Sequence, residues 1–374
     1  MSIVINFIEI EEELNPFDAK FTENITKYSS LNDIIQLNNY DDIKYISCCN
    51  LDINALPTLP KNLISLYCAN NSLKHLPTLP ENLKFLYCCK NELVSLPKLP
   101  NSLIILDCNS NNLSSLPKLP NTLVKLDCYD NKLSSLPNLS NSLECLLCSH
   151  NSLSSLPSLP NLLLHLDCMN NKISNFPNLP NSLISIHSSY NEIYSLPNLP
   201  NSLTYLYCAS NKLVTLSKLP DSLIELNCNN NKISSLPKLP KSLTKLYCWN
   251  NNLSNLPELP NTLQLLQCEC NKISVLPELP DNLKTLICNN NDIKEISKLP
   301  KHITHIYCSV NKLKKIPNFP IPNKLIYLDC SRNNLVELPE GISDIEKVRY
   351  NRNPVHKEIH KYSYLELYDM NRNK

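Results

Sequence analysis

Cysteine is the residue of this sequence whose chemistry has to be decided first. The chain has 374 residues and 18 cysteines, most of which recur at a spacing of 20 residues from Cys48 to Cys308. Such a column of thiols could form disulfides or bind a metal, but both need a specific geometry of the sulfur atoms. Each of these cysteines falls at the inward position of a short alternating segment, where free cysteine acts as a small buried hydrophobe. We therefore expect core packing, in a compartment that keeps thiols reduced.

Two smaller groups of residues could also carry chemistry. Cys145 and Cys148 have the spacing of a CxxC motif, but residues three apart on a strand face opposite sides. Cys145 is therefore expected to point outward, and neither zinc nor redox chemistry follows. His165 and His187 lie one repeat apart near Asp167, an arrangement that could form a metal site or an acid–base pair. Because no nucleophile and no pocket-forming insertion accompanies them, we expect no enzyme activity, no metal and no cofactor.

The composition argues against several classes of function. The only glycine is Gly341, whereas phosphate-binding loops and nucleophile elbows need glycine at several positions. With a formal net charge of +1, the chain lacks the basic excess of a dedicated nucleic-acid binder. The N-terminus has no basic region, and no window is long and apolar enough to span a membrane. We expect a cytoplasmic protein with no membrane partner and no small-molecule substrate.

These residues are positioned by a sequence repeat of 20 residues, which continues from Leu63 to Leu313 without a residue gained or lost. The alternation of Leu66, Tyr67 and Cys68 predicts a short strand, and strands one repeat apart can pair only in parallel and in register. The segment 76–80 contains two prolines, which fix φ and remove hydrogen-bond donors, so we expect it to be extended or polyproline-II. The repeat therefore predicts a stacked solenoid.

The repeat resembles the leucine-rich repeat family, whose motif LxxLxLxxNxL is matched by Leu63, Leu66, Cys68, Asn71 and Leu73. Its length and its Leu-Pro-x-Leu-Pro segment are similar to the short-repeat subclass of bacterial effector proteins, and similar arrays occur in amoebae and giant DNA viruses. The resemblance implies a horseshoe-shaped solenoid with short parallel strands on the concave face and extended segments on the convex face. It also implies a binding scaffold rather than an enzyme, which for an effector would act in the cytosol of a host.

The repeat divides the chain into three parts. The array covers residues 43–355 in about sixteen units, with a two-residue insertion near Pro317. Residues 1–42 and 356–374 do not fit the repeat, and we expect them to be an N-terminal and a C-terminal cap, both small and helical. An alternative for residues 1–42 is a recruiting segment, which would make the chain a substrate-recognition adaptor of a ubiquitin-ligase assembly.

One asparagine in each unit has a structural role by its chemistry. It stands where the chain leaves the strand, and its amide can donate to and accept from backbone groups of its own turn and of the neighbouring turn. This asparagine ladder consists of Asn71, Asn91, Asn111, Asn131, Asn151, Asn171, Asn191, Asn211, Asn231, Asn251, Asn271, Asn291, Asn311 and Asn333.

The outward positions of the strands differ from unit to unit, so they are the candidates for function. They predict aromatic clusters around Tyr67, around Tyr207 and around Trp249, with an acidic patch that contains Asp107, Asp127, Asp130 and Asp167 between the first two. We expect a partner protein of basic or mixed charge to bind along this face. The candidate binding residues are Tyr67, Phe85, Tyr87, Asp107, Asp127, Tyr129, Asp167, His187, Tyr205, Tyr207, Tyr247 and Trp249.

Overall fold

The computed structural model describes residues 38–355, in which the strands form one parallel sheet of 16 strands in chain order. Consecutive strands pair in register, as in the pairing of Leu66 with Leu86 between the second and third strands. The strands are β1 Tyr45–Ser47, β2 Ser65–Tyr67, β3 Phe85–Tyr87, β4 Ile105–Asp107, β5 Lys125–Asp127, β6 Cys145–Leu147, β7 His165–Asp167, β8 Ser185–His187, β9 Tyr205–Tyr207, β10 Glu225–Asn227, β11 Lys245–Tyr247, β12 Leu265–Gln267, β13 Thr285–Ile287, β14 His305–Tyr307, β15 Tyr327–Asp329 and β16 Lys347–Arg349.

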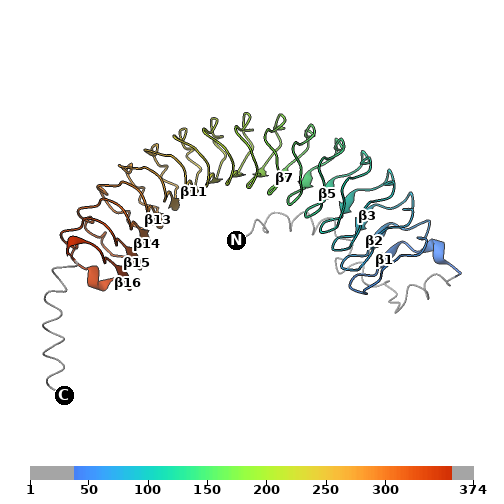
Figure 1. The fold of residues 1–374 in the computed structure, drawn as a ribbon, viewed down its shortest axis with the longest axis horizontal. Helices are drawn as coiled ribbons and strands as arrows, with labels where there is room; N and C mark the ends of the chain where they lie inside the picture. Colours follow the sequence, from blue (N-terminus) through green and yellow to red (C-terminus); the bar gives the residue numbers. More distant parts are fainter. Residues whose placement is uncertain (1–37, 356–374) are drawn as a thin grey trace, which may run out of the picture.

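The described part of the chain curves into an arc whose inner side is lined by the strands (Figure 1). The Leu-Pro-x-Leu-Pro segments are extended, as the prolines predict, and bury leucines such as Leu76 and Leu79 at 9% and 5% exposure. Two 3-10 turns, η2 Tyr40–Asp42 and η3 Ile342–Asp344, stand near the ends of the described range. The solenoid architecture predicted from the repeat is confirmed.

The helical caps predicted for the ends of the chain lie almost entirely outside the described residues, which include only positions 38–42 of the first cap. The two-residue insertion near Pro317 leaves the sheet intact, because β14 and β15 still pair in register with His305 opposite Tyr327. The extra residues are accommodated between the strands, around the exposed Ile321.

Stacked columns of apolar side chains form the core of the solenoid. In the unit that begins at Leu63, that leucine, Leu66, Cys68 and Leu73 are all fully buried. The cysteines of the column are free thiols, and burial raises the pKa of the Cys228 thiol to about 12. A thiol with such a pKa stays protonated at neutral pH, in keeping with a packing role. Ser188, the residue that interrupts the cysteine column, is fully buried and its hydroxyl donates to the carbonyl of Tyr207 at 3.2 Å.

The asparagine ladder ties each turn to the one before it. The amide nitrogen of Asn91 donates to the carbonyl oxygens of Cys68 at 3.0 Å and Cys88 at 3.1 Å. Its amide oxygen accepts the backbone N–H of Leu73 at 3.0 Å. The same contacts continue beyond Asn333, because Asn353 accepts the N–H groups of Asn333 and Leu335 and donates to Cys330. Each amide thus satisfies backbone groups of two units at once.

The turn that presents this asparagine has a left-handed residue directly before it. In the turns from Asn50 to Arg352, this residue has φ between 48° and 60°, although none of these residues is glycine. The position holds residues as different as Asn70, Tyr190 and Val310, and a left-handed conformation costs an L-residue about 1–2 kcal/mol. Because the side chains vary, no pattern in the sequence indicates this left-handed residue. The asparagine hydrogen bonds help to hold the turn in place.

A second set of polar contacts joins the units at the other end of the strands. The hydroxyl of Ser102 donates to the carbonyl oxygens of Glu81 and Leu83, each at 2.7 Å. Ser202 and Thr262 make the same pair of contacts to the unit before them. These hydroxyl contacts were not predicted, although a serine or threonine directly before the first leucine recurs in many units.

Candidate functional site

The outward face of the sheet lies on the inner side of the arc, where a partner would contact many units together (Figure 1). In each strand the middle residue points into the core, and the first and third point outward. Strand β11 shows the pattern, with Lys245 exposed, Leu246 buried and Tyr247 half-buried. Since the strands pair in register, outward residues of neighbouring units stand directly beside each other.

The predicted aromatic cluster at the first units contains a stacked pair of rings. The ring centroids of Tyr67 and Tyr87 are 4.6 Å apart with an interplanar angle of 7°. Burial raises the pKa of Tyr67 above its ordinary value, and the neighbouring hydroxyl of Tyr87 adds a smaller rise. Phe85 occupies the other outward position of β3, in register with Ser65 and Ile105. The structure therefore provides an apolar surface over β2 and β3.

Two carboxylates face each other on the next strands. Asp107 and Asp127 are in register on β4 and β5, and the amide nitrogen of Asn109 lies between them at 2.8 Å and 3.3 Å from their oxygens. Burial and the charge of Asp107 raise the pKa of Asp127 to about 7. The backbone N–H of Tyr129, which donates to Asp127 at 3.1 Å, offsets part of this rise. The two carboxylates therefore repel each other, although Asn109 and the N–H of Tyr129 donate to them.

The acidic patch predicted from the sequence is smaller than expected. Asp130 occupies a left-handed turn beyond the strand and is exposed there, so it does not join the carboxylates on the sheet. Asp167 stands two strands from Asp127, with Leu147 in the register position between them. The patch is thus a pair of carboxylates with a separate third one. Tyr129 turns toward the same edge as Asp130, where its ring meets the edge of His150 at a centroid distance of 5.0 Å.

His187 connects the separate carboxylate to the second aromatic cluster. Its Nδ1 lies 3.8 Å from Oδ1 of Asp167, and its ring centroid lies 5.4 Å from that of Tyr207. Burial lowers the pKa of His187, and Asp167 offsets part of this effect. His165 does not join this contact, because its Nδ1 lies 3.1 Å from the hydroxyl oxygen of Ser185. Among the described residues, no group of three or more His, Cys, Asp or Glu could hold a metal ion.

Cys145 lies at the outward position expected for it, but this position is buried. The exposure of Cys145 is only 1%. In register it stands between Lys125 and His165, which are also buried and whose larger side chains flank it. Cys270 is the exposed cysteine of the described range, at the left-handed turn after β12.

The second aromatic cluster is organised by one carboxylate. Glu225 on β10 lies in register between Tyr205 and Lys245, and the ammonium of Lys245 contacts its Oε2 at 3.0 Å. The Tyr207 side chain hydrogen-bonds the same carboxylate, and burial together with Glu225 raises the pKa of that tyrosine. Tyr247 stands one strand further. The geometry brings these five residues into one polar and aromatic group, which we call the Glu225 cluster.

Trp249 lies at the end of β11 beside another carboxylate. Its backbone N–H donates to the side-chain amide oxygen of Asn229 at 3.1 Å. In the next unit, the amide of Gln267 donates to one oxygen of Glu269, and burial raises the pKa of this glutamate. The other oxygen, Oε2, is buried and has no hydrogen-bond partner in the structure. Trp249 and Glu269 lie at the same position of neighbouring units, beyond β11 and β12, and the cluster of Tyr247 with Trp249 stays a prediction.

Comparison with known proteins explains this architecture. No family model and no curated protein matches the sequence. Among solved structures, YopM from Yersinia pestis, described as a leucine-rich effector protein, is 38% identical with a TM-score of 0.73, covering 82% of this chain and 88% of that chain. The chain belongs to the leucine-rich repeat family. YopM from Yersinia enterocolitica is 36% identical over 80% of this chain and 76% of that one, with a TM-score of 0.66.

A third leucine-rich repeat structure bears on the cysteine column. The functional domain of InlJ from Listeria monocytogenes, described as including a cysteine ladder, is 25% identical and covers 74% of this chain and 64% of that chain, with a TM-score of 0.53. Leucine-rich repeat proteins of this kind are typically interaction scaffolds and are generally not enzymes. No helix within residues 38–355 is long and apolar enough to cross a membrane.

A further aromatic group, near the end of the leucine-rich repeat array, was not predicted. The rings of Tyr307 and Tyr327 stack at 4.7 Å, and that of His305 lies 6.5 Å from Tyr327. The sequence contained the signal, because all three occupy the outward columns. The two stacked rings occupy different outward columns, Tyr307 at the third position of β14 and Tyr327 at the first position of β15, so pairing in register did not indicate their contact.

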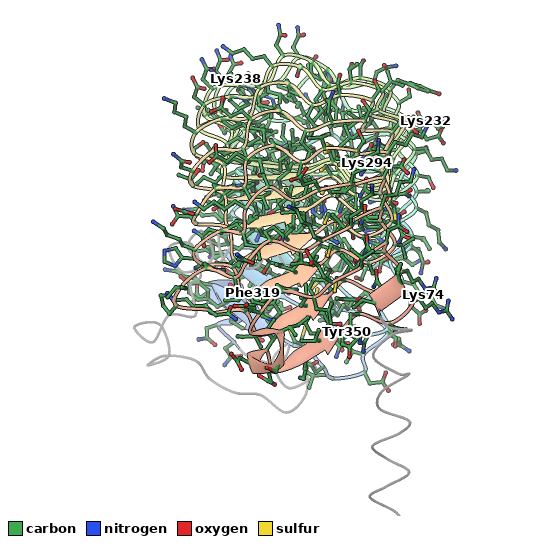
Figure 2. All side chains as sticks on the ribbon, turned by 90° about the vertical axis from the view of Figure 1, so that its left-hand side faces the viewer. Lys74, Lys232, Lys238, Lys294, Phe319 and Tyr350 are labelled. Atoms are coloured by element: carbon green, nitrogen blue, oxygen red, sulfur yellow. The ribbon has the colours of Figure 1, made fainter. Side chains whose placement is uncertain are left out.

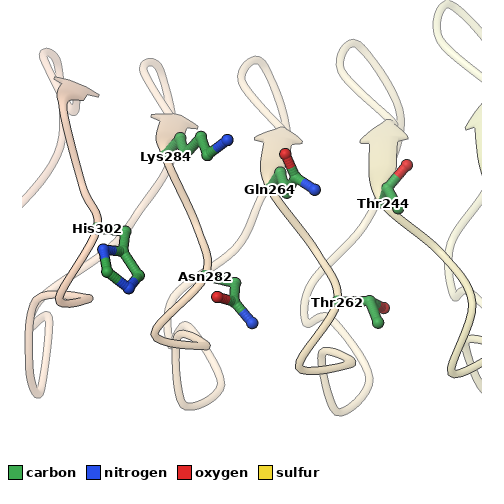
Figure 3. Close-up of a pocket in the computed structure, with 6 residues that line it drawn as sticks. All are labelled: Thr244, Thr262, Gln264, Asn282, Lys284 and His302. Atoms are coloured by element: carbon green, nitrogen blue, oxygen red, sulfur yellow. The ribbon is translucent and has the colours of Figure 1, made fainter.

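The concave sheet is not the only recessed surface of the array. Two shallow pockets lie along the edge where the chain enters the strands. One, of about 310 Å³, is lined by Thr244, Thr262, Gln264, Asn282, Lys284 and His302 (Figure 3). The other, of about 340 Å³, lies near the beginning of the array beside Lys44 and Lys84.

Proposed function

We propose that this chain is a non-enzymatic scaffold that binds a partner protein along the concave sheet. The observation that carries the proposal is the Glu225 cluster, which places Tyr205, Tyr207 and Tyr247 around a Glu225–Lys245 ion pair on three consecutive strands. Tyrosine and tryptophan dominate the centres of protein interfaces, because they combine large apolar area with a polar group. Here these residues alternate with charges on a rigid sheet.

The size and the charge of the face support a protein partner rather than a small molecule. At a strand spacing of about 4.8 Å, sixteen strands provide roughly 75 Å of sheet, enough for an interface of well over 1,000 Å². The Asp107–Asp127 pair favours a partner that supplies lysine or arginine, because a cation between the carboxylates would relieve their repulsion. The proposed contact residues remain Tyr67, Phe85, Tyr87, Asp107, Asp127, Tyr129, Asp167, His187, Tyr205, Tyr207, Tyr247 and Trp249.

In this proposal the protein acts in the cytoplasm, needs no cofactor, and does not bind nucleic acid, a membrane or a small-molecule substrate. The alternative, a ubiquitin-ligase adaptor that recruits its assembly through residues 1–42, has no supporting observation among the described residues. Deletion of residues 1–42 separates the two. The scaffold keeps its concave-face partner after the deletion and shows no ligase association before it, whereas the adaptor loses ligase association while retaining its substrate.

The proposal is tested by comparing two triple variants in pull-downs. Tyr205→Ala/Tyr207→Ala/Trp249→Ala removes rings from the concave face. The control, Tyr190→Ala/Tyr194→Ala/Val214→Ala, removes side chains that are exposed on the turns by 58%, 52% and 53%. We expect the concave variant to lose partners that the wild type and the control retain, while all three have the same circular dichroism spectrum. Equal retention by both folded variants refutes binding through these rings.

A further inference from the structure

The edge pocket at β11–β14 has two rows of side chains that follow the repeat. Thr244, Gln264 and Lys284 stand directly before consecutive strands, and Thr262, Asn282 and His302 form the second row (Figure 3). The rows enclose a shallow groove of about 310 Å³ that crosses the units along the solenoid. This groove is separate from the concave sheet, since none of its lining residues is in a strand.

Positive charge in this groove has no acidic partner. None of the six lining residues is an aspartate or glutamate, and neither Lys284 nor Lys324 forms an ion pair within the described range. Lys324 continues the second row, with its Nζ 3.5 Å from Nδ1 of His302. The nearby carboxylate of Asp281 is already contacted by Lys298 at 3.9 Å and Lys301 at 3.4 Å.

Lysines outnumber carboxylates in this part of the array. Residues 281–324 contain eight lysines and three carboxylates, whereas the whole chain has 35 basic and 34 acidic residues. Along the middle of the array, the position equivalent to Lys284 holds apolar residues such as Ile104, Val124 and Ile184. The groove therefore differs from this edge in the middle of the array, whereas the pocket near the beginning of the array carries Lys44 and Lys84 at the equivalent position.

The hydrogen-bonding groups of the groove limit what can bind there. The hydroxyl of Thr262 donates to the carbonyls of Lys241 and Leu243, and the amide of Asn282 donates to the carbonyl of Asn261. These groups hold the edge together. The ammonium group of Lys284 and the side-chain amide of Gln264 remain as donors for a ligand, and the ammonium group of Lys324, which contacts His302, has further N–H groups to donate. Such a set recognises oxyanions, because ammonium and amide N–H groups donate to carboxylate or phosphate oxygens.

We propose that this groove, from Gln264 to Lys324, binds an acidic peptide segment whose carboxylate or phosphate groups are held by Lys284 and Lys324. A peptide is favoured because the cations follow the repeat along an open groove instead of converging on one deep site. This binding adds an electrostatic contact at the edge of the array and does not depend on the aromatic residues of the concave face.

The proposal is tested by fluorescence anisotropy with three labelled peptides of equal length. One contains spaced glutamates, the second has phosphoserine at the same positions, and the third has glutamine there. We expect the wild-type chain to bind one or both acidic peptides about tenfold more tightly than the glutamine peptide, and more weakly as salt is raised. The comparison of the first two identifies the preferred oxyanion.

Two double variants locate the site. Lys284→Gln/Lys324→Gln is expected to weaken binding of the acidic peptides about tenfold, to the level of the glutamine peptide. The matched control, Lys232→Gln/Lys294→Gln, changes two exposed lysines on the turns after the strands (Figure 2), and is expected to bind as the wild type does. Equal affinity for all three peptides, equal losses in the two double variants, or tighter binding of poly(U) RNA than of either acidic peptide would overturn the proposal. Because the peptides need no concave-face partner, these outcomes are independent of the proposed function.

Discussion

Two sites on the concave sheet each pair two charged residues in register on neighbouring strands, and they differ in the sign of one of these charges. On β4 and β5, Asp107 stands in register beside Asp127, whereas on β10 and β11, Glu225 stands in register beside Lys245. The first site has a carboxyl whose pKa is raised to about 7, and the second has a lysine whose pKa is raised through its hydrogen bond to Glu225. The two carboxylates of the first site repel each other, whereas the opposite charges of the second site attract each other.

The difference shows how a repeat separates architecture from function. Parallel pairing in register places each outward residue about 4.8 Å from its counterpart in the next unit, whatever the two side chains are. The backbone and core therefore stay the same while a single substitution converts a stable ion pair into a like-charged pair. In the proposed interaction, a partner with a basic side chain would gain most at Asp107 and Asp127, while the Glu225 cluster would provide rings in fixed positions.

The largest expected effect comes from removing the strain at the first site. A carboxyl with a folded pKa near 7 and an unfolded pKa near 4 binds more protons in the folded state between these values, so stability falls as pH rises from about 4 to 7. The unfolding free energy lost over this pH range is on the order of 2–4 kcal/mol, and Asp127→Asn should abolish this loss. Urea unfolding at pH 5 and pH 7.5 measures the difference. The exposed Asp221→Asn serves as control, and an identical pH dependence in wild type and Asp127→Asn would disprove the strain.

A somewhat smaller effect is expected from the asparagine ladder, which holds both sites in register. Asn191 donates to the carbonyls of Cys168 and Ser188 and accepts the N–H of Ile173. Asn191→Ala leaves these buried groups without partners and should lower the unfolding free energy by about 1–3 kcal/mol. Asn178→Ala, at an exposed position of the preceding extended segment, should have little effect in the same denaturation experiment. Equal stabilities of the two variants would contradict the role of the ladder.

A gain in stability is expected at the turn that precedes the asparagine. Val310 has φ of 54°, a conformation that its branched side chain disfavours and glycine adopts freely. Val310→Gly should therefore raise the unfolding free energy by about 1 kcal/mol, while Asn290→Gly, in the same turn one unit earlier, should change it much less. A thermal melt of both variants is sufficient, and a loss of stability in Val310→Gly would show that the turn is not strained.

The smallest effect is expected when the satisfied pair is broken. The side chain of Lys245 is 48% exposed, so its contact with Glu225 is screened by water. Lys245→Gln should lower the unfolding free energy by no more than about 1 kcal/mol and leave the fold intact. If urea unfolding shows that Lys245→Gln loses more unfolding free energy than Asn191→Ala, the ion pair is more important to the fold than the comparison of the two sites implies.

The sequence was sufficient to predict those features that depend on the same residue type at the same position of every unit. Leucine, cysteine and asparagine at fixed positions predict the strands, the core and the chain exits, and the prolines predict the extended segments. The left-handed turn could not be predicted in this way, because Tyr190 and Val310 have no common chemistry and only the backbone repeats.

The outward face was predicted less completely, for geometric reasons. The register could be deduced, and it brings Asp107 to Asp127 and Tyr67 to Tyr87. The directions of side chains beyond the strand could not, and Asp130 therefore proved to lie outside the predicted acidic patch. The burial of Cys145 depends on the size of its neighbours across two strands, which a pattern of inward and outward positions does not include.

Site-specific photocrosslinking tests the central claim, that a partner protein lies on the concave sheet, most directly. A photoreactive phenylalanine derivative replaces Tyr207 in the Glu225 cluster or, in a second protein, Lys238, an exposed residue labelled in Figure 2 on the outer side of the arc. We expect irradiation to join a partner protein covalently to the chain at position 207 and not at position 238. Capture of the same partner at position 238 with none at position 207 would contradict the account.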